Sequence, residues 1–158
     1  MEPRIVTLDQ LVLIGRPYFG DAENNKFAQA WDRFFPFEDQ IPSKVNHQVW
    51  YGVEIYGPEF HKDHQWMYFP STEVSSLDEI PEALFGKILP SATYAVFTVK
   101  GGVPKIGETF MYAYDTWFPA SEYEVAHPFD FEYYDERFKA DDPDSELDIY
   151  IPIKAKTA

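Results

Sequence analysis

The sequence predicts an α+β domain made of two β-α-β-β repeats, in which two helices cover one face of an antiparallel sheet. Three pairs of similar segments, in the same order along the chain, indicate the duplication. Two such units side by side leave the other face of the sheet open and roughly symmetric about a pseudo-two-fold axis. The matched segments are FAQAWDRFFP (27–36) and FMYAYDTWFP (110–119), VEIYG (53–57) and FEYYD (131–135), and MYFP (67–70) and IYIP (149–152).

The length of the chain limits the number of domains. A chain of 158 residues can bury one sizeable core but is too short for two independent domains. We therefore expect a single domain over residues 1–158. The first repeat should span residues 1–76 and the second residues 77–158.

Each repeat should begin with a strand and continue into a helix. The strand candidates are LVLIGRPYF (11–19) and TYAVFTVKG (93–101). In both helical segments apolar residues recur at i, i+3, i+4, i+7 and i+8, the stripe of an amphipathic helix. We expect the helices to end at Pro36 and Pro119, because proline cannot continue a helix. Residues 76–92, where the repeats meet, predict a short helix or turn with a linker.

The later strands of each repeat alternate with the period of a half-buried sheet. In VWYGVEIY (49–56) and FDFEYYD (129–135), residues such as Val53 and Phe131 suit the helix-covered face. The sides of these strands that point away from the helices should form an open face, rich in aromatic residues around two acids. Its members are Trp50, Tyr56, Trp66, Tyr68, Tyr134 and Tyr150, with Glu54 and Glu132 among them.

Aromatic rings around a carboxylate suit a flat, lipophilic ligand, ideally a cation, because the rings add stacking and cation–π attraction. Desolvation by the rings should raise the pKa of such an acid unless a cation or hydrogen-bond donors compensate. An acid of this kind can also transfer protons near neutral pH. Two other uses remain open: the aromatic residues could simply stabilise the sheet, or the face could form a homodimer interface.

The composition excludes several classes of function. A net charge of −14 repels phosphate backbones and anionic lipids, so we expect neither a nucleic-acid nor a membrane partner. The absence of cysteine excludes disulfides and thiolate metal sites. The histidines of HKDH (61–64) lack a clear third ligand, and we expect a solvated loop with no metal or cofactor. No signal peptide or membrane-length apolar run is visible, which predicts a cytoplasmic location.

Four segments of the chain resemble the GyrI-like small-molecule-binding domain family, which supplies the effector-binding domain of multidrug-sensing regulators. They are EPRIV near the start, IPEALFGKILPSATYAVFTVKGG (80–102), WFPASEYEVAHPFDFEYYDERF (117–138) and ELDIYIPIK (146–154). The resemblance implies the duplicated fold and an aromatic ligand cleft with an acid at its centre. The matching acid is Glu132, and Tyr68 and Tyr150 resemble pocket tyrosines.

The resemblance also implies a stand-alone member, because the chain leaves no room for the helix-turn-helix unit of the regulators. We expect a binding protein for lipophilic, planar or cationic small molecules. Some stand-alone members hydrolyse cyclopropanoid DNA-alkylating toxins. In such a reaction Glu132 would polarise or deliver the water, Tyr134 or Tyr150 would orient it, and Trp50 and Trp66 would stack on the toxin. The alternative is a non-enzymatic protein-interaction module of the gyrase-inhibitor type, and Glu54 could replace Glu132 as the principal acid.

Overall fold

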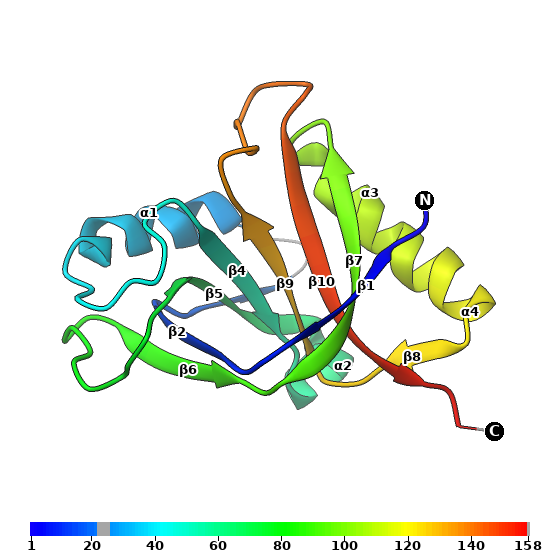
Figure 1. The fold of residues 1–158 in the computed structure, drawn as a ribbon, viewed down its shortest axis with the longest axis horizontal. Coiled ribbons are helices and arrows are strands. Elements are labelled where there is room, and N and C mark those ends of the chain that lie inside the picture. Colours follow the sequence, from blue (N-terminus) through cyan, green and yellow to red (C-terminus); the bar gives the residue numbers. More distant parts are fainter. Residues whose placement is uncertain (22–25, 158) are drawn as a thin grey trace.

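A computed structural model describes residues 1–21 and 26–157 of the chain (Figure 1). The predicted α+β class is confirmed, since two main helices lie against one antiparallel sheet of ten strands. The strand order is β1-β7-β10-β9-β4-β5-β2-β6, with β3 paired to β5 and β8 paired to β10. The strands β4 and β9, one from each predicted repeat, are therefore neighbours in the middle of the sheet.

The strands are β1 Arg4–Leu8, β2 Leu11–Gly15, β3 Tyr18–Asp21, β4 Trp50–Ile55, β5 Gln65–Glu73, β6 Phe85–Leu89, β7 Ala92–Lys100, β8 Tyr123–Val125, β9 Phe129–Tyr134 and β10 Glu146–Ala155. The helices are α1 Phe27–Glu38, the short α2 Pro58–Asp63 and α3 Pro104–Tyr112. The helix α3 continues through a π-helical turn, Ala113–Trp117, into α4 Phe118–Ala120.

The sheet curls around its main core. Apolar side chains of β2 and β6, at one end of the strand order, contact those of β4, β7 and β9 in one buried cluster. Strands so far apart in the order can share a cluster only if the sheet folds over, which Figure 1 shows. Each fully buried side chain of this kind contributes about 1.5–3 kcal/mol to folding. The buried cluster includes Leu13, Val53, Leu89, Tyr94 and Phe131.

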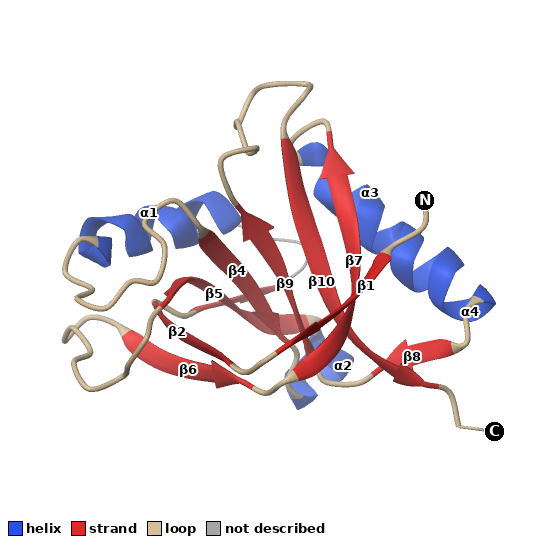
Figure 2. Ribbon diagram, in the orientation of Figure 1, coloured by secondary structure: helices blue, strands red, loops and turns tan. Residues whose placement is uncertain are grey.

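The two main helices cover the opposite, outer face of the sheet (Figure 2). Trp117 and Phe118 pack on Phe97 and Ile149 of that face, while Phe34 of α1 packs on Ile14. We had expected the helices on the face of Val53 and Phe131, and this expectation is wrong. That face is filled by the curl of the sheet itself.

Three local predictions also need correction. The helix α1 continues through Pro36 to Glu38, and α4 continues through Pro119 to Ala120. Pro119 lies in the first turn of α4, where its missing N–H costs no helical hydrogen bond. Pro36 lies in the last turn of α1, which ends two residues later. Residues 76–92 contain the turn that the sequence allowed, at Pro81–Leu84, but in place of a helix they form β6, which pairs with β2. The HKDH segment is not a plain loop, since α2 covers its first three residues.

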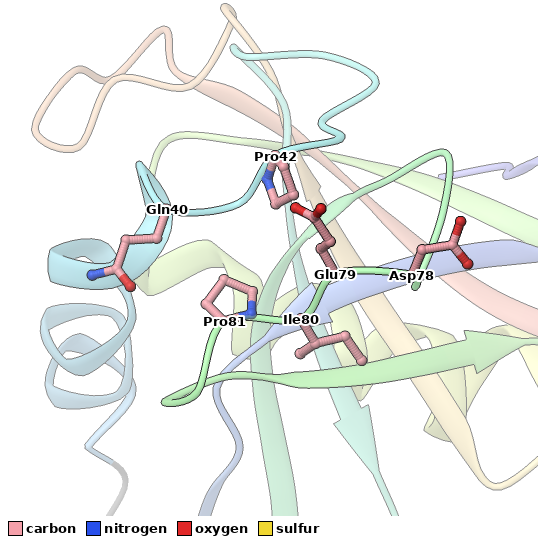
Figure 3. A pocket seen from close by; sticks show the side chains of 6 residues that line it. All are labelled: Gln40, Pro42, Asp78, Glu79, Ile80 and Pro81. Atoms are coloured by element: carbon pink, nitrogen blue, oxygen red, sulfur yellow. The ribbon is translucent and has the colours of Figure 1, made fainter.

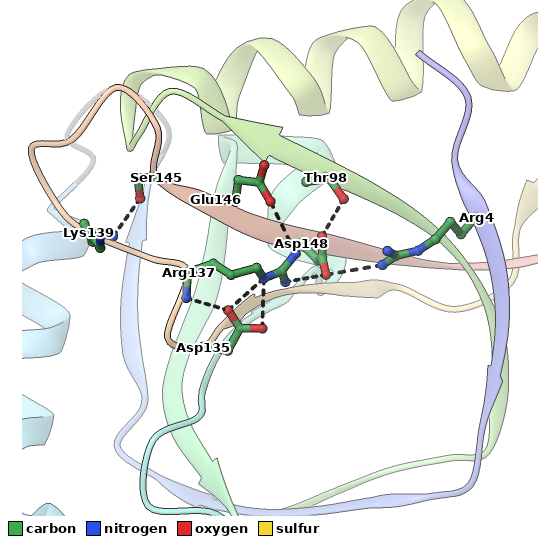
Figure 4. A network of polar contacts seen from close by, with 8 residues as sticks. All are labelled: Arg4, Thr98, Asp135, Arg137, Lys139, Ser145, Glu146 and Asp148. Carbon is green, nitrogen blue, oxygen red and sulfur yellow. Dashed lines mark hydrogen bonds and ion pairs between the residues drawn. The ribbon is translucent and has the colours of Figure 1, made fainter.

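A polar network secures the end of the sheet where β9 turns into β10 (Figure 4). Arg137 donates to Asp135 at 2.9 Å and to Asp148 at 2.8 Å. Asp148 also accepts from Thr98 of β7 at 2.7 Å and from Arg4 of β1 at 3.3 Å. Because these contacts join residues of β1, β7, β9 and β10, they hold the ends of these four strands together.

No helix in the described part of the chain has both the length and the apolar character needed to cross a membrane.

Candidate functional site

A cavity of about 1180 Å³ lies between the two main helices and the outer face of the sheet. Its floor comes from β4, β5 and β9, and its walls come from α1, α2 and α3. Eleven of its 23 lining residues are phenylalanine, tryptophan or tyrosine. They include Phe27, Trp31, Trp66, Phe110, Tyr114 and Phe138.

Most of the site residues predicted from the sequence lie around this cavity. Tyr68 lies just beneath the floor, where only 1% of its surface is exposed, and its hydroxyl contacts the acid above it. The predicted residues that line the cavity are Trp50, Glu54, Tyr56, Trp66, Glu132 and Tyr134. Their roles in binding or catalysis stay predictions.

The predicted position of Tyr150 is wrong. Tyr150 pairs with Phe131 in the sheet, whereas Ile149 pairs with Glu132. Because facing residues share one side of a sheet, Tyr150 points into the inner core and stacks on Phe131, with ring centroids 4.7 Å apart. Aligning IYIP with MYFP had suggested that Tyr150 corresponds to Tyr68. In the sheet the two tyrosines lie on opposite faces.

The pairing of β4 with β9 is symmetric about the pair Val53–Phe131. Tyr56 donates its hydroxyl to Glu54 Oε2 at 2.7 Å, and Tyr134 donates its hydroxyl to Glu132 Oε1 at 2.6 Å. The Glu-x-Tyr pattern of the two repeats therefore forms the same local structure twice. The acids lie side by side on neighbouring strands and not on opposite walls of the cleft.

The symmetry breaks at Gly52 and Asp130. Gly52 pairs with Glu132, and Asp130 pairs with Glu54. The Tyr68 hydroxyl passes directly over Gly52 and donates to Glu132 Oε1 at 2.9 Å, and a Cβ at position 52 would collide with that hydroxyl.

Asp130 carries a carboxylate where the other half has glycine. Its Oδ2 accepts hydroxyl hydrogen bonds from Tyr56 at 3.1 Å and from Tyr114 at 3.0 Å. The site therefore contains a third acid, which the sequence placed on the same face but did not single out.

Each helix connects to one acid through an aromatic side chain. In α1, Trp31 Nε1 donates to the Tyr68 hydroxyl at 3.2 Å, and that hydroxyl donates to Glu132. In the π-helical turn after α3, Tyr114 donates directly to Asp130. The sequence alignment of the repeats matched Trp31 with Tyr114. It gave no sign that both residues reach the acids.

Replacing Gly52 by alanine should destabilise the protein by about 1–3 kcal/mol, because the added Cβ overpacks the site and displaces the Tyr68 hydroxyl. Urea unfolding measures this change. The matched control is Gly107→Ala in α3, a solvent-exposed position at the cavity where an added Cβ meets nothing within 4 Å. That variant should gain up to about 1 kcal/mol, since alanine favours a helix. Equal effects of the two substitutions would contradict the proposed crowding.

The three acids are buried in a group. The exposed fractions are 6% for Glu54, 0% for Asp130 and 2% for Glu132. Burial and the charge of Asp130 raise the pKa of Glu54 well above its usual range. Burial raises the pKa of Asp130 to about 8, although hydrogen bonds from Tyr114 and Tyr56 oppose the shift.

The donors around the acids remain protonated. Burial and the neighbouring Glu132 raise the pKa of both Tyr68 and Tyr134 well above the usual range. These hydroxyls therefore keep the hydrogen that they donate to the carboxylate near neutral pH. Two acid oxygens, Asp130 Oδ1 and Glu132 Oε2, have no hydrogen-bond partner among the described residues. An unpartnered buried carboxylate oxygen is costly unless a ligand or a proton compensates.

A second, shallower pocket of about 460 Å³ lies beyond the end of α1 (Figure 3). Its described lining residues include no aromatic ring. The residues are Gln40, Pro42, Asp78, Glu79, Ile80 and Pro81. The aromatic, acid-centred cavity is therefore the candidate functional site. The described residues contain no group of three or more acids and histidines arranged to hold a metal ion.

Comparison with known proteins places these features in context. The sequence model of the Cass2 family, described as integron-associated effector binding protein, matches residues 4–153. The transcriptional regulator BrlR of Pseudomonas aeruginosa is 38% identical over 156 residues, which cover 97% of this chain and 56% of the regulator. The chain thus spans about half the length of this curated relative.

Two solved structures share the fold. The structure of SAV2435 bound to tetraphenylphosphonium has a TM-score of 0.76 at 19% identity, covering 98% of this chain and 94% of that one. A hydrolase from Listeria innocua has a TM-score of 0.59 at 8% identity, covering 97% and 92% of the two chains. At these identities the likeness concerns the fold alone.

Proposed function

Because this chain belongs to the Cass2 family of integron-associated effector binding proteins, we propose that its cavity binds lipophilic organic cations with aromatic or planar bodies. The observation that carries this proposal is Glu132. Its carboxyl group is buried on the cavity floor, and its Oε2 has no hydrogen-bond partner among the described residues. A cationic ligand would supply the missing partner.

The charge of the cavity supports a cation over a neutral or anionic ligand. Glu54 and Glu132 line it, Asp130 lies directly behind, and the lining contains no lysine or arginine among the described residues. The rings of Trp31, Trp66 and their neighbours offer faces for cation–π contact. SAV2435, which has the same fold, was solved with tetraphenylphosphonium, a lipophilic cation.

The size of the cavity supports a bulky ligand. Its volume of about 1180 Å³ exceeds the range of roughly 300–1,000 Å³ that is typical of small-molecule sites. Four aryl rings around a central charge fit such a space better than a small amine would. The ligand charge can then approach Glu132 while the rings contact the helices.

A second candidate function is hydrolytic opening of a cyclopropanoid ring. The free Glu132 Oε2 could accept a proton from a water molecule, and the Tyr134 hydroxyl lies 2.6 Å from the other carboxyl oxygen. Water would attack a ring carbon, the adjacent C–C bond would break, and its electron pair would move onto the conjugated carbonyl and be protonated. Tyr150 cannot take part, because it faces the inner core.

Two measurements test the two functions separately. Trp31, Trp50 and Trp66 line the cavity, so tetraphenylphosphonium should quench the tryptophan fluorescence in a saturable, one-to-one manner. The neutral triphenylphosphine oxide serves as the control and should bind much more weakly. No saturable quenching at millimolar concentration would reject cation binding. Incubation with a cyclopropanoid alkylator, followed by mass spectrometry, should show a gain of one water if the protein is a hydrolase.

A further inference from the structure

We propose that Asp130 is a further acid of this binding site, which holds a proton while the cavity is empty and releases it when a permanent cation enters. This inference rests on the proposed function and adds to it a preference for permanent cations. The site would then favour permanent cations increasingly as the pH rises.

The acids are too close together to ionise fully. Glu54 pairs with Asp130 across β4 and β9, and the Tyr56 hydroxyl lies 2.7 Å from Glu54 Oε2 and 3.1 Å from Asp130 Oδ2. That hydroxyl has one hydrogen, which it cannot give fully to both acids. Buried carboxylates bridged by one neutral hydroxyl cannot all carry charge without a compensating cation. The empty cluster must therefore hold at least one proton.

The described residues around Asp130 provide no positive charge. Its Oδ2 accepts from Tyr56 and Tyr114, and its Oδ1 has no partner among the described residues. The side chain is completely buried. Among the described residues, only neutral hydroxyls and acids lie close to its carboxyl group. The titratable groups that face the cluster or line the cavity are Glu54, Tyr56, His61, Tyr68, Tyr114, Asp115, His127, Glu132 and Tyr134.

A ligand cation would change this balance. With an apparent pKa of about 8 in the empty protein, Asp130 keeps its proton at neutral pH but holds it weakly. A positive charge fixed above the cluster favours the ionised form of each carboxyl group, which lowers its proton affinity. By linkage, a ligand that displaces a proton binds more tightly at higher pH.

Titration calorimetry with tetraphenylphosphonium tests the inference, because this probe has no titratable group. Measurements in buffers with different ionisation enthalpies count the protons released on binding. We expect close to one proton per ligand at pH 7, and a rise in affinity of about tenfold per pH unit between pH 6 and pH 8.

The variant Asp130→Asn keeps the size of the side chain and removes its titration. It should still bind the probe, but its affinity should rise by less than about threefold per pH unit. Asp141→Asn, an exposed acid in the β9–β10 loop, is the matched control and should behave like the unaltered protein. An unchanged proton count in Asp130→Asn would overturn the assignment.

The two proposals can fail separately. Binding of the probe without proton release would overturn the role of Asp130 and leave cation binding intact. Absence of binding would overturn the proposed function. In that case carbon NMR of the side-chain carboxyl groups tests Asp130 in the empty protein. Titration of its carboxyl group near pH 4 would refute the stored proton, and titration above pH 7 would support it.

Discussion

Replacing Glu132 by glutamine is expected to weaken the binding of tetraphenylphosphonium by roughly 30- to 1,000-fold, or about 2–4 kcal/mol. The substitution removes the charge of a residue that lines the cavity and whose buried Oε2 has no hydrogen-bond partner among the described residues. The amide oxygen of glutamine can still accept hydrogen bonds from Tyr68 and Tyr134, so the fold should be preserved. Titration calorimetry measures the loss, and circular dichroism checks the fold.

The control for this experiment is Glu136→Gln, which removes the same charge from an exposed position just beyond β9. It should change the affinity by less than about twofold, because exposed charges are screened by solvent. The parallel variant Glu54→Gln decides between the two central acids. If Glu54→Gln loses binding and Glu132→Gln does not, the assignment of Glu132 as the principal acid is wrong.

The free energy of unfolding is expected to fall by a few kcal/mol, on the order of 1.4 kcal/mol per unit of pKa shift, between pH 5 and pH 9. The pKa of Asp130 is raised in the folded protein to about 8, and burial also raises that of Glu54. A raised folded pKa gives stability that is complete below the unfolded value near 4 and is lost as the pH rises through the folded value. Urea unfolding at pH 5, 7 and 9 measures the slope.

Asp130→Asn should flatten this slope, because it removes one of the groups that bind a proton more tightly in the folded state. Asp148 acts in the opposite sense, since hydrogen bonds from Arg137 and Thr98 outweigh its burial and lower its pKa. Its contribution is lost only as the pH falls below about 4. A series that begins at pH 5 therefore leaves out the contribution of Asp148. A slope that is unchanged in Asp130→Asn would contradict the raised pKa.

Strand alternation predicted correctly that Glu54, Tyr56, Glu132 and Tyr134 share one face of the sheet. It could not predict which face the helices cover, because both faces carry large apolar or aromatic side chains. That choice depends on the curl of the sheet, which brings Leu13 and its neighbours over the other face. The curl arises from pairing between strands that are distant in sequence.

The error at Tyr150 has a simple cause. Side chains alternate with a period of two, so an alignment that is wrong by one residue moves a side chain to the opposite face. The similarity of MYFP and IYIP matched the tyrosines, whereas the hydrogen-bonded register pairs Glu54 with Tyr68 but Glu132 with Ile149. The sequence likewise did not indicate the role of Gly52, because the Tyr68 hydroxyl that occupies the space above it comes from β5.

Because Gly52 in one half corresponds to Asp130 in the other, the two ends of the cavity are not equivalent. With identical halves, an elongated ligand could enter in two equivalent orientations, related by the pseudo-two-fold axis. Gly52 leaves room for a hydroxyl on one side of the axis, and Asp130 places a carboxyl group on the other. A ligand whose charge lies at one end therefore has one preferred orientation. Regioisomers that differ only in the position of their charge should be bound unequally.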